Sequence, residues 1–392
     1  MGTGSSTADH LRAALDGPWR DIREQARKEL ADERFAGDPT LDYKAARARV
    51  LEQMRELAAR DYAKRGFGLE AGGLADPGGA VTALEMVAYA DLSLWVKSGV
   101  QWGLFGGAVE NLGTERHREY LKKLITLDLL GCFAMTESGH GSDVASLETT
   151  ATYDPDTQEF VIHTPTPSAR KDYIGGAAEH ARMAAVFAQL ITQGESKGVH
   201  CFLVPIRDEQ GADLPGVTTS DDGLKGGLLG VDNGRIVFDH VRVPREALLN
   251  RYADVAPDGS YSSPIENPSR RFFTTLGTLV RGRISVGGAA AAGARVALSI
   301  AVRYALQRRQ FSDPDSGEEV VLMDYRMHQR RLLPLVAKSY AYAFAQNDLV
   351  RRMHLVQSGQ DLDPGAQRAL EKRAAGLKVA QTRQATRALQ EW

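Results

Sequence analysis

The run MTESGHGSDV, residues 135–144, gathers hydroxyl, carboxylate, imidazole and glycine residues in one short stretch. Glu137, His140 and Asp143 are residue types that carry out acid–base catalysis. Their spacing alone places none of them beside a substrate carbon. The run therefore predicts a polar loop at a functional site, but it does not identify which residue, if any, is a catalytic base.

The same run could form a loop that binds a ligand. Thr136 is a short hydroxyl donor, and Gly139 and Gly141 allow a tight turn in which backbone amides face a ligand. Farther along, residues 173–176 combine an aromatic side chain with two glycines where the backbone could approach a ring. A planar cofactor ring needs these features, although most clusters of Gly, Ser and Thr are ordinary turns.

The composition is that of a globular protein with two or three domains. The 392 residues are 43% hydrophobic and 25% charged, and the formal net charge of −2 argues against a surface dedicated to nucleic acid. Cys132 and Cys201 lie beside large apolar residues and lack the clustered ligands of a zinc site. We expect core thiols and no bound metal.

The ends of the chain resemble no targeting signal. The N-terminal residues lack the apolar core of a signal peptide, and no run of about 18 apolar residues suggests a membrane span. The final residues, LQEW, differ from the Ser-Lys-Leu peroxisomal signal. We therefore expect a cytoplasmic protein without a membrane span.

The hydrophobic period changes twice along the chain. Residues 1–130 and 251–392 have apolar residues at the three- and four-residue steps of helices. Residues 131–250 contain runs rich in β-branched and aromatic residues, namely QEFVIHT, MAAVFAQLIT, GVHCFLVPI and GRIVFDHVRV. This order predicts an α+β chain with an N-terminal helical domain, a central β domain and a C-terminal helical domain.

The order also excludes the commonest nucleotide-binding architecture. A Rossmann site needs a glycine-rich turn directly between a strand and a helix. The run GGAAAAG, residues 287–293, lies inside a helical stretch instead. Its small residues indicate a close approach of helices.

Longer stretches give the chain a family resemblance. CFAMTESGHGSDVASLETTATYD is followed, in the expected order and spacing, by GVHCFLVPIRDEQGADLPGV, GLLGVDNGRIVFDHVRVPREALLNRYADV and RISVGGAAAAGARVALSIAVRYALQRRQF. From about residue 30 to residue 391, the chain resembles the acyl-CoA oxidases, which are relatives of the acyl-CoA dehydrogenases. The resemblance implies a central β-barrel or sandwich domain and a C-terminal helical bundle that is incomplete here.

The resemblance implies FAD as the cofactor. Thr136 matches the threonine that hydrogen-bonds the flavin, Gly175 matches the position whose backbone meets it, and Tyr173 would form an aromatic wall. Arg308 matches an arginine that reaches the flavin pyrophosphate from a neighbouring subunit, which implies a homodimer. From the residues alone, a solvated side chain of its helix is the favoured interpretation of Arg308.

Two matches concern the substrate, and two departures concern the flavin wall. Ser142 matches a loop position near the acyl-CoA chain, although a capping serine is the plainer reading. Arg283 matches a residue that lines the CoA site.

In the family's Lys-aromatic-aromatic-Pro-Gly-Gly segment, Asp172 replaces an aromatic residue and Ile174 replaces the proline, so we expect a different environment for the flavin ring.

The resemblance implies an oxidase. A carboxylate base removes the α-proton of an acyl-CoA, the β-hydrogen passes to the flavin, and molecular oxygen takes the electrons, which gives trans-2-enoyl-CoA and hydrogen peroxide. The family's catalytic glutamate falls beyond Trp392, so we expect a truncated chain with no catalytic residue of its own. Glu137 and Asp143 are interpreted as residues that organise the loop.

Three alternatives remain open at this stage. The first is an acyl-CoA dehydrogenase that uses an electron-transfer flavoprotein. The second is a non-catalytic protein that binds FAD or acyl-CoA. The third is an interaction protein without a cofactor, suggested by the basic residues of the final helix, although a solvated face explains those residues more simply.

Overall fold

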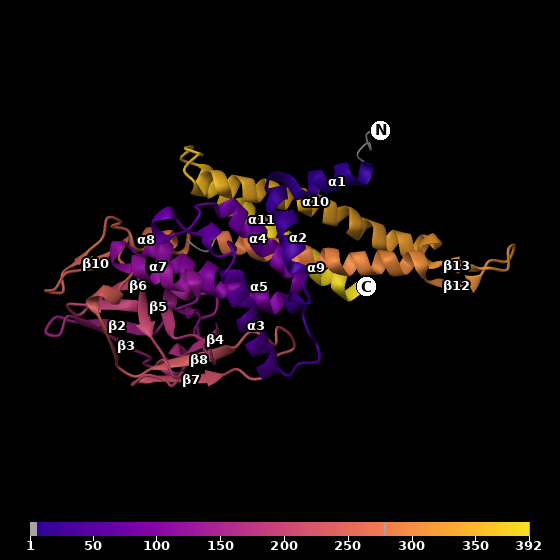
Figure 1. Ribbon diagram of the computed structural model, residues 1–392. Coiled ribbons are helices and arrows are strands. Elements are labelled where there is room, and N and C mark those ends of the chain that lie inside the picture. Colours follow the sequence, from indigo (N-terminus) through magenta and orange to yellow (C-terminus); the bar gives the residue numbers. More distant parts are fainter. Residues whose placement is uncertain (1–5, 278–279, 392) are drawn as a thin grey trace. The chain divides into compact units, whose positions relative to one another are not determined.

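The computed structural model describes residues 6–277 and 280–391, which form two compact units. The β unit comprises residues 37–75 and 93–280, and the helical unit comprises the segments up to 36, from 76 to 92 and from 281 onward. The elements follow the order helices, strands, helices (Figure 1), so the predicted α+β class is confirmed. Each unit combines segments that are distant in the sequence. The predicted boundaries after residues 130 and 250 stay a prediction.

The β unit is built on two sheets. In the larger sheet, the long strand β5 pairs with β6 antiparallel, and with β1 and β2 in parallel along successive parts of its length. β3 and β9 continue this sheet beyond β2, and the second sheet has the order β4-β8-β7. The strands of the larger sheet are β1 (Gly131–Ala134), β2 (Thr150–Asp154), β3 (Glu159–His163), β5 (Met183–Thr192), β6 (Glu195–Pro205) and β9 (Val241–Pro244). Those of the second are β4 (Lys171–Gly175), β7 (Val217–Asp221) and β8 (Asn233–Phe238), and a small ribbon pairs β10 (Asp254–Val255) with β11 (Tyr261–Ser262).

Apolar side chains of both sheets share one core. Phe160 and Phe202 pack edge to face with ring centroids 4.9 Å apart, and Phe238 of the second sheet is fully buried in the same cluster. Each such side chain contributes about 1.5–3 kcal/mol relative to leaving it exposed. This core fixes the ends of β1 and β4, from which the polar loops of the site extend.

Helices of the β unit hold the start of β1. Between α5 (Leu92–Ser98) and α6 (Gly106–Leu112) lies a π-helical segment, η5 (Gly99–Phe105). Its Gln101 donates to the carbonyls of Leu124 and Leu129 and accepts a 2.8 Å hydrogen bond from the backbone amide of Gly131. The remaining α-helices of this unit are α3 (Tyr43–Ala58), α7 (Arg118–Thr126) and α8 (Pro268–Leu276).

The helical unit confirms that its glycines permit close packing. A Cβ at Gly287 would lie 2.2 Å from Gln381 Oε1, and one at Gly288 would lie 2.8 Å from Gln346 Nε2. Those two glutamines are hydrogen-bonded to each other at 3.2 Å. The α-helices of this unit are α1 (Thr7–Asp16), α2 (Arg20–Leu30), α4 (Pro77–Ala90), α9 (Val280–Gln307), α10 (Arg326–Gln357) and α11 (Ala366–Glu391), and β12 (Arg309–Ser312) pairs with β13 (Glu319–Val321).

The stretch from Pro268 to Gln307, which contains α8 and α9, is long and apolar enough to satisfy the criterion for a membrane-crossing helix. Its most apolar 18 residues have a mean hydropathy of 1.5, and 44% of them are buried. A core helix of a water-soluble protein meets the same criterion. Ala294, Leu298 and Ala305 of α9 lie in a buried cluster with Leu335 of α10, so this helix has a packed face within its own unit.

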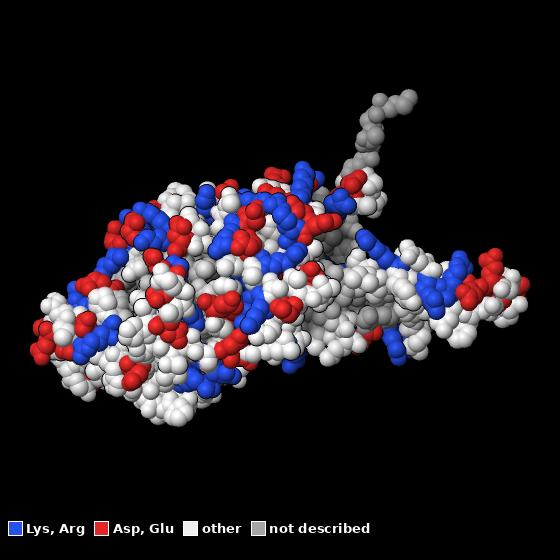
Figure 2. Space-filling model, turned by 60° about the horizontal axis from the view of Figure 1, so that its bottom comes forward, with Lys and Arg blue, Asp and Glu red and all other residues white. Residues whose placement is uncertain are grey.

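Charges of both signs are interleaved on the face that Figure 2 shows. Many of the exposed ion pairs join neighbours on one helix, such as Arg20 with Glu24 and Lys122 with Glu119. Exposed pairs of this kind contribute about 0–1 kcal/mol each. The buried ion pairs of the β unit, described below, matter more for the site.

His200 on β6 makes the stability of the β unit depend on pH. Its Nδ1 donates to the Gly198 carbonyl (2.9 Å) and its Nε2 accepts from the Tyr261 hydroxyl (3.0 Å). Burial lowers the pKa of His200 from 6.5 to about 4. The unfolded chain therefore binds more protons between these values, and we expect the unfolding free energy to fall by about 2 kcal/mol between pH 8 and pH 5.

Urea unfolding at the two pH values checks this expectation. His200→Gln should lose much of the pH dependence, whereas the exposed control His240→Gln should keep it. An unchanged pH dependence in His200→Gln would contradict the assignment.

Candidate functional site

A buried ion pair organises the loop that follows β1. Glu137 and Lys171, at the start of β4, lie 3.0 Å apart, and both side chains are fully buried. The Lys171 ammonium also donates to the carbonyls of Met135 (3.2 Å) and Phe187 (2.7 Å). Burial lowers the pKa of Lys171 to about 8, against the opposing effect of Glu137.

Glu137 has its hydrogen-bonding capacity occupied within the loop. Oε1 accepts from Lys171, from the Thr149 amide (3.0 Å) and from the Thr149 hydroxyl (2.6 Å), while Oε2 accepts from the Glu148 amide (2.8 Å). A general base must instead reach the proton that it removes. The interpretation of Glu137 as a residue that organises the loop is confirmed.

The neighbouring polar residues also hold the loop. Asp143 accepts from the Ser146 hydroxyl at 2.7 Å, and His140 Nε2 lies 3.4 Å from Glu148 Oε1. Ser142 is exposed at the tip of the loop. Ser142 is therefore accessible to a ligand, whereas Asp143 and His140 make contacts that stabilise the loop.

The loop and β4 bring Thr136 close to Tyr173. Glu137 forms an antiparallel bridge with Lys171, and the Asp172 amide donates to the Thr136 carbonyl at 3.1 Å. Within residues 6–277 and 280–391, the Thr136 hydroxyl has no hydrogen-bond partner. A residue with a free hydroxyl donor therefore lies opposite Asp172, which precedes Tyr173 in β4.

Tyr173 has an unusual backbone. Its φ is +62°, and the residue is 71% exposed. An aromatic residue in the left-handed region is a genuine outlier that surrounding contacts must maintain. Asn233 supplies one of them, because its side-chain amide donates to the Tyr173 carbonyl at 3.1 Å.

Glycines after Tyr173 serve two different purposes. Gly176 has a φ of +93°, which favours glycine. A Cβ at Gly175 would lie 3.1 Å from Val100 Cγ2 of the π-helical segment. The absence of a side chain at Gly175 thus lets the turn pack against η5, in addition to the predicted contact with a flavin.

Asp172, where the family has an aromatic residue, belongs to a charged cluster. It accepts from the Ser138 hydroxyl (2.8 Å) and pairs with Arg170 (3.0 Å) and Arg235 (3.2 Å). Burial opposes ionisation, yet the bonds from Ser138 and Arg170 hold the pKa of Asp172 below its usual value. A carboxylate that pins Ser138 of the loop therefore replaces an aromatic side chain.

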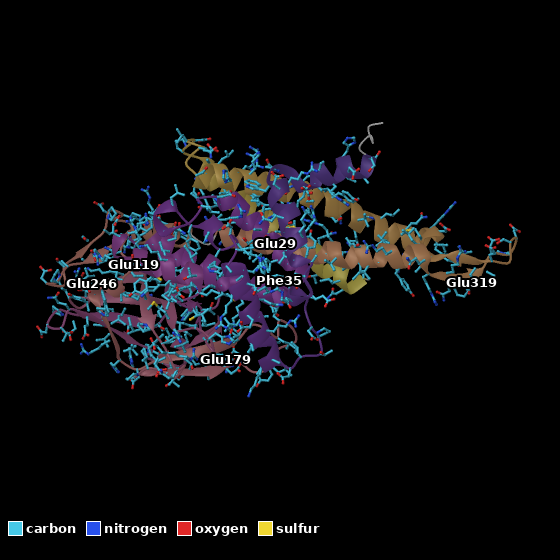
Figure 3. All side chains as sticks on the ribbon, in the orientation of Figure 1. Glu29, Phe35, Glu119, Glu179, Glu246 and Glu319 are labelled. Carbon is cyan, nitrogen blue, oxygen red and sulfur yellow. The ribbon has the colours of Figure 1, made fainter. Side chains whose placement is uncertain are left out.

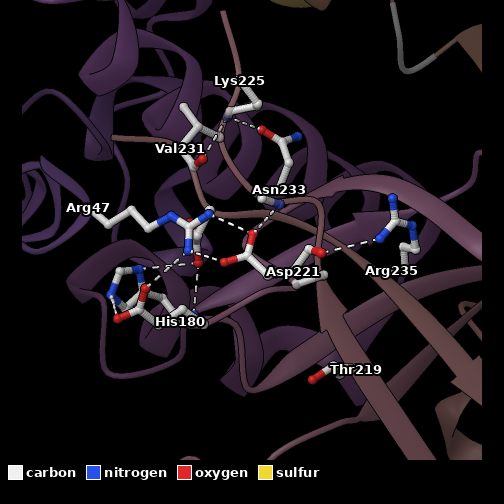
Figure 4. A network of polar contacts seen from close by, with 12 residues as sticks. Arg47, His180, Thr219, Asp221, Lys225, Val231, Asn233 and Arg235 are labelled. Carbon is white, nitrogen blue, oxygen red and sulfur yellow. Dashed lines mark hydrogen bonds and ion pairs between the residues drawn. The ribbon is translucent and has the colours of Figure 1, made fainter. Parts of the chain in front are cut away.

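A second cluster of buried charged residues, Lys97, His180 and Asp232, lies at the turn that follows β4. Asp232, just before β8, accepts from Lys97 Nζ at 2.6 Å and from the His180 amide at 2.9 Å. Burial raises the pKa of Asp232, but Lys97 and His180 outweigh it and hold the value far below normal. Figure 4 shows that Arg47 and Asp221 lie beside this cluster, joined by two hydrogen bonds of 2.6 and 2.8 Å.

Sequence reasoning missed Lys97, His180 and Asp232 as site residues. Lys97 and Asp232 give a weak signal, because each is an isolated ionisable residue in WVKSGV and LGVDNG, whereas His180 in AAEHAR lies beside Glu179. Lys and Asp are rarely buried unless they are paired. The sequence does not say that these three residues meet.

Arg308 and Arg283 lie in the helical unit, whereas Thr136 lies in the β unit, and each unit is described by itself. Arg308 follows the last residue of α9 and Arg283 lies in its first turn. Both side chains are exposed. Their predicted contacts with the flavin pyrophosphate and with CoA stay predictions.

A surface group of possible metal ligands is poorly arranged for an ion. The ligand atoms of His163, Asp239 and His240 lie within 4.8 Å of one another. The two imidazoles are stacked, with centroids 3.9 Å apart and planes 26° apart. Nearly parallel rings direct their lone pairs along similar directions instead of toward one point.

Comparisons with known proteins agree with this fold and loop. A family model for the acyl-CoA dehydrogenase middle domain matches residues 132–241, and one for the acyl-CoA oxidase C-alpha1 domain matches residues 276–392. The chain is 50% identical to acyl-coenzyme A oxidase 3, peroxisomal, from Arabidopsis thaliana over 288 residues, which are 70% of this chain and 43% of that protein.

Two solved structures extend the likeness. Acyl-CoA oxidase 1 from Yarrowia lipolytica has a TM-score of 0.84 at 30% identity, over 99% of this chain and 57% of that one. Acyl-CoA oxidase-1 from Caenorhabditis elegans, complexed with FAD and ATP, has a TM-score of 0.79 at 28% identity, over 97% of this chain and 56% of that one. The chain belongs to the acyl-CoA oxidase family, and it spans about half the length of the curated relatives it matches.

The prediction of a cytoplasmic protein is wrong by this comparison. Relatives from Arabidopsis thaliana and Homo sapiens carry the word peroxisomal in their names. The prediction rested on the lack of a signal-peptide pattern and of an apolar span and on the final four residues, and the family relationship outweighs these patterns.

Proposed function

We propose that the chain forms the FAD-binding portion of an acyl-CoA oxidase. The observation that carries this proposal is the free hydroxyl of Thr136, which lies opposite Asp172, the residue before the exposed, left-handed Tyr173. A hydroxyl donor beside an aromatic wall suits the polar edge and the face of a flavin ring. The relative from Caenorhabditis elegans that is complexed with FAD supports this choice of cofactor.

The residues have distinct roles in the proposal. Thr136 donates a hydrogen bond to the flavin, Tyr173 covers part of the ring, and the backbone at Gly175 approaches it. Arg308 of a second copy binds the pyrophosphate, because a planar guanidinium suits two phosphate oxygens. The functional assembly is therefore a homodimer.

A bound flavin would supply the acceptor for the β-hydrogen of an acyl-CoA, and molecular oxygen would take up the electrons. Ser142 and Arg283 would contact the acyl-CoA. Glu137 would not remove the α-proton, since its oxygens already accept four hydrogen bonds inside the loop. The setting would be fatty-acid β-oxidation, in the peroxisome as for the named relatives.

Reaction with oxygen distinguishes the oxidase from the acyl-CoA dehydrogenase alternative. FAD-loaded protein reduced with dithionite under anaerobic conditions is expected to be reoxidised by oxygen alone, with stoichiometric formation of hydrogen peroxide. Flavin absorbance and a peroxide assay follow the reaction. Reoxidation that requires an added electron-transfer flavoprotein would favour the dehydrogenase reading.

A further inference from the structure

A cavity of about 810 Å³ lies within the helical unit. Helices α1, α2, α4, α9 and α10, all of this unit, supply nearly all of its lining residues. The volume lies in the range of roughly 300–1,000 Å³ that is typical of small-molecule sites. Much of the wall is apolar and includes Leu11, Leu15, Leu30, Met86, Leu298 and Val302. The cavity therefore suits a ligand with an aliphatic part.

Two arginines of the cavity wall share one carboxylate. Arg23 of α2 lies 3.1 Å from Glu85 Oε2, and Arg295 of α9 lies 3.4 Å from Glu85 Oε1. The side chain of Glu85 is 1% exposed, and those of Arg23 and Arg295 are 6% and 24% exposed. Because one carboxylate balances one guanidinium, the group has an excess charge of about +1. In a region of low dielectric, a bound anion stabilises such a charge.

Arg295 has donors without a good partner, whereas Arg23 does not. Arg23 donates to Glu85, to Asn347 Oδ1 (3.2 Å) and, through Nε, to a backbone carbonyl (3.2 Å). Both Nη atoms of Arg295 approach the same Glu85 oxygen, at 3.4 and 3.5 Å. Its Nε has no hydrogen-bond partner among the residues that the structure describes. Since a guanidinium has five N–H donors, Arg295 can bind an anion without giving up Glu85.

Tyr89 of α4 adds a hydroxyl beside Arg295. The Arg295 guanidinium donates to the Tyr89 oxygen, so the O–H of Tyr89 is left to donate elsewhere. Burial raises the pKa of Tyr89, and the hydroxyl therefore keeps its proton at neutral pH. Both residues line the cavity. A guanidinium and a hydroxyl side by side are suitable donors for the two oxygens of a carboxylate.

Other acidic groups do not balance the excess charge. Asp16, which also lines the cavity, is already paired with Arg27, whose Nη1 donates to Asp16 Oδ2 at 2.9 Å. Glu29 of α2, labelled in Figure 3, accepts from Gln25 at 2.9 Å and does not line the cavity. The positive charge at Arg295 therefore remains available to a ligand.

We propose that this cavity binds an aliphatic carboxylic acid, whose carboxylate contacts Arg295 and Tyr89 and whose chain lies along the apolar wall. A single excess charge matches a monoanion, and the apolar wall matches an alkyl chain. The site belongs to the helical unit, whereas Thr136, Tyr173 and Gly175 belong to the β unit. The inference does not rest on the proposed function.

Isothermal titration calorimetry with decanoate, below the concentration at which micelles form, tests the site. The parent chain should bind decanoate at least about 10-fold more tightly than decanol, which has the same chain without a charge. Arg295→Met should bind decanoate at least about 10-fold more weakly than the parent and decanol equally well, because methionine is apolar and has no donor. This variant should fold, since Glu85 keeps its pair with Arg23.

Arg281→Met is the matched control. Arg281 lies on the same helix, donates to Gln357 and does not line the cavity. Its replacement should leave the affinity for decanoate within about 2-fold of the parent, because the bonds that it removes lie elsewhere. Circular dichroism compares the folding of the three proteins.

Hydrogen exchange locates the bound acid in the parent chain, so this measurement does not depend on any variant. Decanoate should slow exchange in peptides covering residues 8–31 and 295–303, and peptides covering residues 131–149 and 171–181 should stay unchanged. The proposal would be overturned by equal affinity for decanoate and decanol, by unchanged binding in Arg295→Met, by slowed exchange confined to the β unit, or by no binding at millimolar decanoate. None of these outcomes bears on FAD binding, which is measured separately.

Discussion

Replacing Lys171 by methionine is expected to lower the free energy of unfolding of the β unit by about 3–5 kcal/mol, because breaking a buried ion pair leaves an unpaired charge. The partner left behind is Glu137, which is fully buried and paired to Lys171 at 3.0 Å. The variant also removes the donors to the carbonyls of Met135 and Phe187. Urea unfolding followed by circular dichroism measures the loss.

Two companion variants make this test specific. Lys122→Met, which breaks an exposed pair with Glu119, should change the unfolding free energy by less than about 1 kcal/mol. Lys171→Met combined with Glu137→Leu should recover part of the loss, since an apolar pair leaves no buried charge. Equal stability of Lys171→Met and Lys122→Met would contradict the buried pair.

Replacing Arg308 by alanine is expected to weaken FAD binding by about 10–150-fold. The estimate follows from the roughly 1.5–3 kcal/mol that a hydrogen bond to a charged group contributes. Arg308 is exposed at the end of α9 and has no hydrogen bond from its side chain to any residue that the structure describes. Its loss should therefore leave folding unchanged and affect the ligand.

The neighbouring arginine provides the control. Arg309 donates to the Glu319 carbonyl within the β12–β13 hairpin, so Arg309→Ala should retain FAD as the parent does. The fraction of flavin that co-elutes with protein on gel filtration compares the three proteins. Equal retention by Arg308→Ala and the parent would remove Arg308 from the flavin site.

The strands could be predicted from the sequence where most of their side chains are buried. The runs MAAVFAQLIT and QEFVIHT correspond to β5 and β3, because β-branched and aromatic side chains fit a packed sheet. The run GRIVFDHVRV is divided into two strands at Asp239 and His240. Polarity alone does not reveal that break.

The partners of buried charges could not be predicted in the same way. Lys171 and Glu137 are 34 residues apart, and Lys97 and Asp232 are 135 apart. Such pairs form where tertiary packing excludes water, which local periodicity does not encode. The loop 135–144 was recognised from its residue types, whereas the contacts that leave Thr136 free and occupy Glu137 needed coordinates.

Hydrogen exchange of the 392-residue chain with and without FAD tests the central claim most directly, because it reports both binding and location. The account predicts that FAD slows exchange in peptides covering residues 131–149 and 171–181, while peptides from residues 195–205 of β6 stay unchanged. Slowed exchange confined to other segments, or no change at any FAD concentration, would contradict a flavin site formed by Thr136, Tyr173 and Gly175.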